Sequence, residues 1–337
     1  SAARDKITAT QARKIISDIH RQVTGSDLIH FTLRAYVDQW RFAKKGTISP
    51  STFKAYETAT NDLCSSLGER ADADLVHITS SDIMMFRNSI AKSTSASTAN
   101  LRLKIVRIVF QQAWREGLIT DNPAAKVSIL KNDRTGEARR GFTLDELKIL
   151  LSEASGEWKG LILFGLYTGQ RLGDLARLCW GNIDRTQGTL VLNTRKTDRR
   201  QILPLAEPLL HWVEKNHSAQ EAKAPLFPMS SAAAEASGTV GTLSNQFQKI
   251  LTRCGLSESR SHEKKEGGKG RSGSRAASEL SFHSLRHTAT SLMKNAGISP
   301  ALVQEFVGHD SKTISQNYTH IDLQALRTAL SGLPDIG

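Results

Sequence analysis

A charged stretch without a regular apolar pattern divides the sequence in two. Residues 126–141, KVSILKNDRTGEARRG, separate two regions in which apolar residues recur with helical or strand spacing. A segment without such spacing offers no continuous apolar face, so it predicts a connection between two folding units. We therefore expect a basic N-terminal segment over residues 1–24, a helical unit over 25–126, a linker over 127–141 and a second unit over 142–337.

The first unit has the pattern of four short helices. Apolar residues recur at intervals of three and four over residues 30–43, 49–68, 79–91 and 97–117. Ser49 and Pro50 are typical of a helix start, and Gly68 and Gly117 are typical of helix ends. The sequence therefore predicts a compact helical unit that ends near Pro123, which cannot continue a helix.

The fourth of these helices carries a polar stripe. Asn100, Lys104, Arg107 and Gln111 are spaced at i, i+4, i+7 and i+11, which places them on one helix face. Side chains of these types hydrogen-bond to base edges and phosphates, although an ordinary solvated face has the same pattern. We treat these four residues as candidate DNA contacts, together with Arg139 and Arg140 of the basic linker.

The second unit has a mixed pattern. Thr143 and Glu146 form a predicted capping box, and residues 157–169 have the composition of a buried helix. Residues 189–205 predict a β-hairpin with a polar turn, and helical patterns follow over 208–216, 242–255, 280–297 and 299–309. The expected fold class is mainly α (α+β), with one small antiparallel sheet. Residues 257–275, rich in Gly, Ser and Lys, predict a disordered insertion that extends at most to residue 278.

The charge of the chain favours a nucleic acid as its partner. The formal net charge is +12 over 337 residues, and an anionic membrane surface is the weaker alternative. The three cysteines form no CxxC pair, which argues against a disulfide framework and a cysteine zinc site. No apolar run approaches the roughly 18 residues of a membrane span, and no signal-peptide pattern is present. We therefore expect a nucleic acid as the partner, no membrane contact and a reducing, cytoplasmic location.

Residues suited to chemistry occur in four places. TGQRLGDLARL carries Arg171 at the start of an expected amphipathic helix, and HSLRH carries His283, Arg286 and His287. The hairpin turn contains Lys196, and GHDSKTISQNYTH contains His309 and Tyr318. His283 and His287 have the spacing of a zinc pair, but Ser284 follows His283 where an HExxH helix has its glutamate. We expect neither a metal nor a cofactor.

Arginines, histidines, a lysine and a tyrosine suit phosphoryl transfer at a DNA phosphodiester. The transition state gains negative charge on its non-bridging oxygens, which arginine forks can bind bidentately. A tyrosine hydroxyl can attack the phosphorus and hold the strand as a phosphotyrosine, while a lysine protonates the leaving 5′ oxygen.

The motifs resemble those of the tyrosine recombinase (phage integrase) family over residues 28–325. TGQRLGDLARLCWGNID is similar to the family's first arginine box, HSLRHT to its His-x-x-Arg box, and VGHDSKTISQNYTH to its closing segment. The resemblance implies that Arg171 and Arg286 hold the scissile phosphate and that Tyr318 attacks it. It further implies these roles: Lys196 as general acid, His283 as proton acceptor, His309 as a phosphate ligand, Asp174 as support for the arginines and His287 as a packing or second-layer residue.

The resemblance also implies an activity and an assembly. It predicts a site-specific DNA recombinase of a phage or another mobile element, acting through a 3′-phosphotyrosine and a Holliday junction without metal or ATP. The two units would form a C-shaped DNA clamp. The protein would be a monomer or weak oligomer in solution and a homotetramer on double-stranded DNA target sites, with accessory DNA-bending proteins as possible partners. Its location would be cytoplasmic and nucleoid-associated.

Three questions stay open at this point. A type IB-like topoisomerase would use the same chemistry, and a non-catalytic DNA-binding regulator could retain the fold. The leucines of the tail, at positions 323, 326, 330 and 333, form one apolar stripe. This stripe could pack on its own domain or on a neighbouring subunit.

Overall fold

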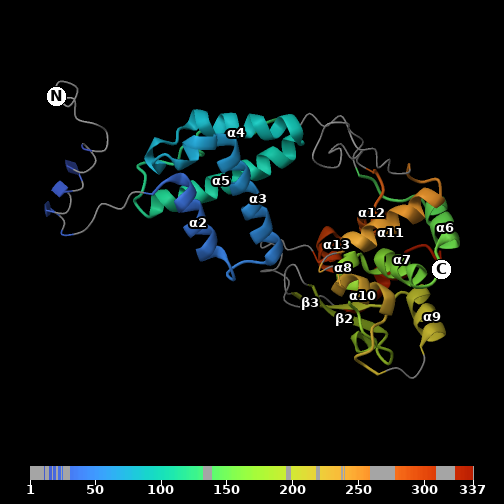
Figure 1. Cartoon of the computed structure of the whole chain (residues 1–337). Helices are drawn as coiled ribbons and strands as arrows, with labels where there is room; N and C mark the ends of the chain where they lie inside the picture. The colour runs from blue at the N-terminus through green and yellow to red at the C-terminus, as the bar shows by residue number, and fades with distance from the viewer. Residues whose placement is uncertain are drawn as a thin grey trace. The chain divides into compact units, whose positions relative to one another are not determined.

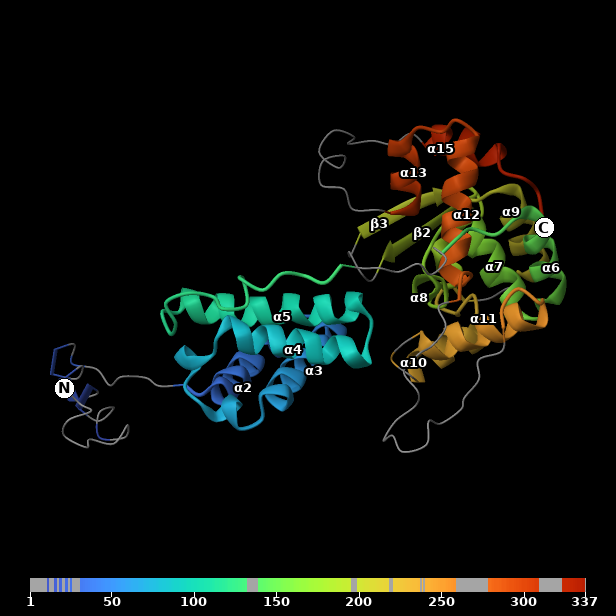
Figure 2. The same ribbon diagram turned by 90° about the horizontal axis from the view of Figure 1, so that it is seen from above.

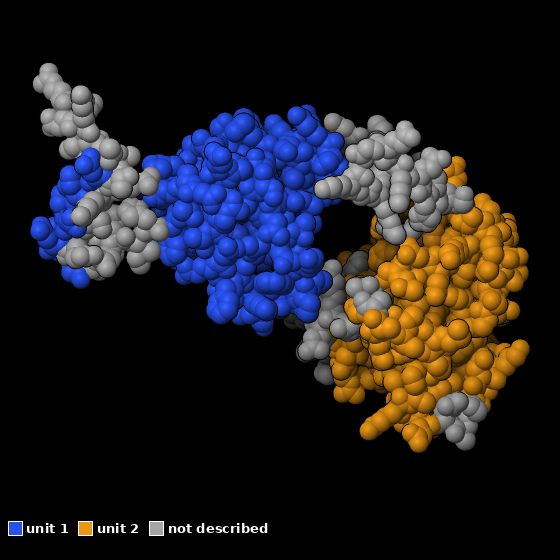
Figure 3. Space-filling view, in the orientation of Figure 1, with its two compact units in different colours: residues 1–135, 269–274 blue, residues 136–268, 275–337 orange. Residues whose placement is uncertain are grey.

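The structure is a computed structural model. In it the chain folds into two compact units (Figure 3). It describes residues 31–131, 139–194, 199–217, 221–236, 240–258, 278–308 and 323–336, together with residues 11, 15, 16, 18, 19, 22, 23, 25 and 238. The described residues up to 131 belong to the first unit, and those from 139 onward belong to the second. Most of the expected N-terminal segment and of the expected insertion lies outside the described residues.

The first unit contains the four predicted helices (Figure 1). They are α2 (Leu33–Lys44), α3 (Pro50–Leu67), α4 (Ser80–Ser93) and α5 (Ala96–Arg115). Polar side chains fix their starts, since Ser49 accepts a hydrogen bond from the backbone of Thr52, and Thr79 forms a capping box with Asp82. Their apolar faces meet in one core that includes Leu33, Phe86 and Phe110.

The second unit combines helices with a three-stranded antiparallel sheet (Figure 2). Its helices are α6 (Leu144–Glu153), α7 (Glu157–Thr168), α8 (Leu172–Leu175), α9 (Glu207–Asn216), α10 (Pro228–Ala236), α11 (Gly241–Arg253), α12 (Phe282–Asn295), α13 (Pro300–Val307) and α15 (Leu323–Ser331). The strands are β1 (Ile183–Asp184), β2 (Thr189–Thr194) and β3 (Arg199–Pro204). The predicted hairpin and capping box are confirmed, because β2 pairs with β3 and Thr143 caps α6 with Glu146.

One expected element of this unit is wrong in length. The sequence predicts an amphipathic helix that begins at Arg171, but α8 is a single turn that ends at Leu175. The chain then turns into a 3-10 turn over Trp180–Asn182 and into β1, which the sequence did not predict.

Helix α7 is the centre of the second unit. Its residues from Gly160 to Thr168 are all buried, which agrees with its nearly continuous apolar sequence. Helix α12 packs directly on it, and this close approach depends on Gly165. A Cβ atom at Gly165 would lie 2.8 Å from Phe282 and 2.9 Å from Leu285.

The end of the chain packs on its own unit. Leu326, Leu330 and Leu333 are buried in the same core as α7 and α12. The hydroxyl of Tyr167 donates to the carbonyl of Pro334 at 2.7 Å and accepts from the backbone N–H of Ile336 at 3.2 Å. Three of the four leucines of the stripe therefore pack on the tail's own domain, whereas Leu323 is exposed. Docking of the tail on a neighbouring subunit stays a prediction.

Within the described ranges, the helices are too short or too polar to cross a lipid bilayer.

The contact between α7 and α12 leads to a stability prediction. We expect Gly165→Ala to lower the free energy of unfolding by about 1–3 kcal/mol, because the added methyl group overlaps Phe282 and Leu285. Urea unfolding measures the change. Gly332→Ala is the matched control, because its Cβ would make only ordinary contacts. Equal stability of the Gly165→Ala protein and wild type would contradict the close packing of these helices.

Candidate active site

Arg286 is a buried arginine at the centre of the candidate site. It lies on α12, and only 3% of its surface is exposed. Its Nη1 atom donates a hydrogen bond of 2.8 Å to the carbonyl oxygen of Gly169. Gly169 follows α7 directly and has a left-handed backbone conformation with φ of 62°, which a residue with a side chain rarely adopts. The loop after α7 is thereby turned so that its carbonyl meets the guanidinium group.

Arg171 brings a second positive charge to the same place. It lies two residues after Gly169, at the start of α8, and is partly buried. Burial and the charge of Arg171 lower the pKa of Arg286 to about 10, while the carboxylate of Asp174 acts in the opposite direction. The guanidinium groups of Arg171 and Arg286 and the buried carboxylate of Asp174 are therefore close enough to interact. Two positive charges and one negative charge leave this group of three side chains with a net positive charge.

Each arginine also keeps a buried N–H group without an acceptor. Within the described part of the chain, Nη1 of Arg171 and Nη2 of Arg286 have no hydrogen-bond partner. A buried donor without an acceptor costs about 1–3 kcal/mol, so such groups call for an explanation. An anion with two oxygens placed toward these groups would satisfy both the charge and the hydrogen bonds.

His283 lies on the first turn of α12, and its side chain is exposed over part of its surface. Partial burial is the largest cause that, together with the nearby His287, Arg286, Arg139 and Arg171, lowers its pKa to about 4. The ring is therefore neutral near pH 7 and able to accept a proton. His287 contacts it edge to face, with 4.9 Å between ring centroids. No metal-binding cluster occurs among the described side chains.

The end of α13 contacts residues 169–171, the segment after α7 that we call the arginine loop. Gln170 donates from Nε2 to the carbonyl oxygen of Phe306 at 3.3 Å, and a Cβ atom at Gly169 would touch Val307 at 3.0 Å. Gln201 of β3 donates to the carbonyl oxygen of Glu305 at 2.9 Å. The loop after α7, strand β3 and the last turn of α13 are therefore held together.

Three predicted site residues lie outside the described residues. Lys196 belongs to the turn between β2 and β3, His309 follows the described Gly308, and Tyr318 precedes α15. The flanking contacts nevertheless bring the hairpin and the end of α13 to the arginine loop. Arg171 lies together with His283 and Arg286, although it precedes them by more than a hundred residues in the sequence.

Gln170 and Gln201 are site-supporting residues that the sequence analysis did not identify. Gln201 is 4% exposed and occupies an inward position of β3, between the outward Arg200 and Ile202. A polar residue at an inward strand position is a signal that could have identified it. Gln170 lies inside the TGQR motif, directly before Arg171, and its sequence position alone gives no signal of a separate supporting role.

The polar stripe of α5 is largely occupied by contacts within the first unit. Asn100 exchanges two hydrogen bonds of 2.8 Å with the backbone of Leu130, and Arg107 donates to the carbonyl oxygens of Ala124 and Val127. Asn122 donates to the side chain of Gln111 at 3.1 Å. These bonds fasten the segment after α5 onto the helix.

Lys104, the remaining member of the stripe, is exposed. A DNA-binding role of the four residues stays a prediction, and Lys104 is the member whose side chain faces solvent.

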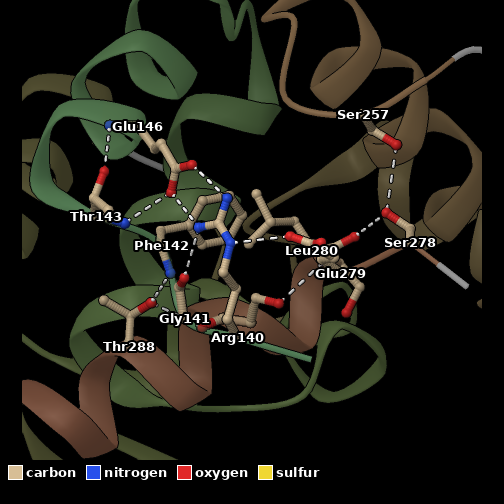
Figure 4. Close-up of polar contacts among 12 residues, drawn as sticks. Arg140, Gly141, Phe142, Thr143, Glu146, Ser257, Ser278, Glu279, Leu280 and Thr288 are labelled. Carbon is tan, nitrogen blue, oxygen red and sulfur yellow. Dashed lines mark hydrogen bonds and ion pairs between the residues drawn. The ribbon is translucent and has the colours of Figure 1, made fainter. Parts of the chain in front are cut away.

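The two linker arginines differ in their surroundings. Arg140 donates to both carboxylate oxygens of Glu146 and to the carboxylate of Glu279, as Figure 4 shows. Arg139 is exposed, and its charge acts on His283. A DNA contact by either residue stays a prediction.

Comparison with known proteins gives a consistent result. The model of the phage integrase family matches residues 141–325, which is more than half of the chain. The tyrosine recombinase XerC of Roseiflexus sp. (strain RS-1) is 27% identical over 294 residues, covering 83% of this chain and 86% of that protein. The integrase of Escherichia phage lambda is 29% identical over 255 residues, covering 73% of this chain and 65% of the phage protein.

Solved structures agree in fold. A lambda integrase (75–356) dimer bound to a COC′ core site has a TM-score of 0.62 and 24% identity, covering 87% of this chain and all of that chain. The expected fold class is confirmed, and the expected enzyme class, a tyrosine-type site-specific DNA recombinase, agrees with the names of the relatives. The chain belongs to the phage integrase family.

Proposed function

We propose that this protein is a site-specific DNA recombinase that cleaves and rejoins DNA through a 3′-phosphotyrosine intermediate and a Holliday junction. The observation that carries the proposal is the pair of Arg171 and Arg286, each with a buried N–H group that lacks an acceptor among the described residues. A phosphodiester supplies the missing negative charge and presents two non-bridging oxygens in the geometry that guanidinium forks bind.

The arginine pair suits the transition state better than the ground state. The attacked phosphorus becomes five-coordinate, and its non-bridging oxygens gain negative charge. Fixed positive groups in a site withdrawn from water bind that extra charge without having to reorganise. This is the contribution that metal ions make in other phosphoryl-transfer enzymes, so we propose a reaction that needs neither metal nor ATP.

The remaining roles follow from the chemistry of the side chains. In cleavage, the Tyr318 oxygen forms a bond to phosphorus, and the bond from phosphorus to the 5′ oxygen breaks. The tyrosine proton passes to the neutral ring of His283, and Lys196 donates a proton to the leaving 5′ oxygen. His309 donates a hydrogen bond to a phosphate oxygen, and Asp174 supports the arginines. Rejoining is the same exchange in reverse, so the bond energy is conserved.

The assembly is proposed by analogy with structural neighbours. A lambda integrase tetramer bound to a Holliday junction has a TM-score of 0.59 and covers 94% of this chain. We propose that this protein likewise acts as a homotetramer on two DNA sites, in the cytoplasm at the nucleoid, as part of a phage or another mobile element.

The nucleophile gives the first test of the chemistry. Tyr318→Phe removes only the hydroxyl, so we expect normal DNA binding and no covalent protein–DNA adduct. A suicide substrate that traps the 3′-phosphotyrosine measures the adduct on a denaturing gel. Wild-type protein should form it in the presence of EDTA.

Two results would contradict this assignment, namely cleavage by the Tyr318→Phe protein or a strict Mg²⁺ requirement for wild-type cleavage. Relaxation of a plasmid that carries no target site would favour a topoisomerase instead.

The arginine pair and the general acid give the second test. Arg171→Lys and Arg286→Lys should each lower the cleavage rate by roughly 10²-fold or more, because an ammonium group cannot replace a bidentate fork. A substrate with a 5′-bridging sulfur has a leaving group that needs no proton. It should restore cleavage to the Lys196→Ala protein but not to the Arg286→Ala protein. Lack of restoration for Lys196→Ala would refute its role as general acid.

The neutral state of His283 gives the third test. We expect an NMR titration of the free protein to give a pKa of about 4 for this ring, against an ordinary value of 6.5. Between these two values the unfolded chain binds more protons at this group, so the native state loses stability as the pH falls from 6.5 toward 4. Above pH 6.5 the ring is mainly neutral in both the native and the unfolded state, so none of this stability is lost.

His283→Gln is the matching variant. Urea unfolding at several pH values should show a weaker loss of stability below pH 6.5 for this variant than for wild type. A His283 pKa at or above 6.5 would contradict the lowered pKa on which this role rests, and a pKa well above 7 would mean that the ring is already protonated when it should accept a proton.

A further inference from the structure

An ion-pair cluster holds the chain at the point where it enters the second unit (Figure 4). The guanidinium group of Arg140 donates two hydrogen bonds of 2.7 Å to Glu146 and one of 3.2 Å to Glu279. Its backbone N–H also donates to the carbonyl oxygen of Glu279 at 3.4 Å. Glu146 lies in the first turn of α6, and Glu279 lies three residues before α12, so Arg140 joins two separate parts of the fold.

The residues that follow Arg140 lie directly on α12. The backbone N–H of Phe142 donates to the hydroxyl of Thr288 at 2.7 Å, and this hydroxyl donates to the carbonyl oxygen of Ser284 at 2.9 Å. A Cβ atom at Gly141 would lie 3.0 Å from the Thr288 hydroxyl and 3.3 Å from its backbone. Thr288 is 4% exposed, so this contact is closed to water. The chain is thereby fixed against the helix that carries His283 and Arg286.

This attachment determines where Arg139 lies. Arg139 immediately precedes the anchored residue, and Thr288 is five positions after His283, a rise of about 7.5 Å along the helix. The exposed guanidinium group of Arg139 is close enough to act on His283 electrostatically. In the described ranges, no carboxylate pairs with Arg139, whereas Arg140 contacts two.

We propose that Arg140 is a positioning residue that holds Arg139 beside the active site, where Arg139 binds the DNA phosphate next to the one held by Arg171 and Arg286. Adjacent arginines thus have different tasks. The charge of Arg140 is used within the fold, and the charge of Arg139 is presented to the nucleic acid. This inference rests on the proposed function, because it requires DNA at the site.

The ring of His283 reports the position of Arg139 without any cleavage. Arg139→Gln removes a charge that opposes protonation, so we expect the pKa of His283 to rise by about half a pH unit, the effect of one nearby charge in a largely aqueous setting. Arg140→Gln should produce the same rise, because it releases Arg139. The double variant should show no further rise, since both changes remove one interaction.

Arg185→Gln is the matched control, since Arg185 is an exposed arginine of the same unit whose guanidinium lies beside His217. It should leave the pKa of His283 unchanged. Glu279→Gln weakens the ion-pair cluster while keeping Arg140. It replaces Arg140→Gln in this experiment if the Arg140→Gln protein does not fold, and it should likewise raise the pKa of His283. Thr288→Val should act like Arg140→Gln, whereas Thr288→Ser, which keeps the hydroxyl, should behave like wild type.

DNA binding gives the second measurement. In a Tyr318→Phe background, log affinity falls linearly with log salt. Arg139→Gln and Arg140→Gln should each make this negative slope shallower by about one, the value for one lost phosphate contact. A purely structural role of Arg140 would instead lower the melting temperature and leave both the His283 pKa and the salt slope unchanged. That result, or additive shifts in the double variant, would overturn the proposal.

These outcomes are separate from a failure of the proposed function. The His283 titration uses free protein, and the salt slope uses a protein that cannot cleave. Cleavage by Tyr318→Phe would therefore refute the chemistry while leaving the positioning of Arg139 intact.

Discussion

The hydrogen bond from buried Arg286 to the carbonyl oxygen of Gly169 is the contact on which the second unit depends. It requires α12 to lie close against α7, which Gly165 permits, and it requires the left-handed turn at Gly169. The same turn brings Arg171 to the start of α8 and lets Gln170 reach the last turn of α13. One polar contact therefore orders three segments that are distant in the sequence.

The electrostatics of this contact support the proposed role of Arg286 in binding an anionic ligand. Burial and a neighbouring guanidinium lower the pKa of Arg286 to about 10. The folded protein therefore keeps a positive charge that is shielded from water and close to a second positive charge, and both conditions cost free energy. Such strain persists at functional sites because a bound substrate relieves it. An anion that accepts from the free N–H groups of Arg171 and Arg286 would convert this cost into binding energy. Partial burial, assisted by the same positive field, lowers the pKa of His283 and keeps its ring neutral near pH 7.

Sequence reasoning succeeded where structure is encoded locally. Thr143 and Glu146 cap α6 because both partners lie within one turn, and the β2–β3 hairpin follows from alternation around a polar turn. Helix α10 was missed because its cap comes from a distant residue: Glu157 accepts hydrogen bonds from the backbone of Met229 and Ser230.

The polar stripe of α5 shows the same limit in a different form. Spacing placed Asn100, Arg107 and Gln111 on one face, but it could not show that residues 122–130 would occupy that face with backbone groups and the side chain of Asn122. The grouping of Arg171, His283 and Arg286 was expected only from the family resemblance. Composition and periodicity give no distance between residues more than a hundred positions apart.

The central claim is that Arg286 neutralises charge on the scissile phosphate. It is tested most directly by a DNA strand in which a methyl group replaces one non-bridging oxygen of that phosphate, which makes the phosphate neutral. Cleavage rates of wild type and Arg286→Ala are compared on this strand and on the ordinary one. We expect Arg286→Ala to lose roughly 10²-fold or more on the charged phosphate and less than about tenfold on the neutral one, because the charge to be neutralised is gone. An equal loss on both strands would show that Arg286 does not act by neutralising that charge.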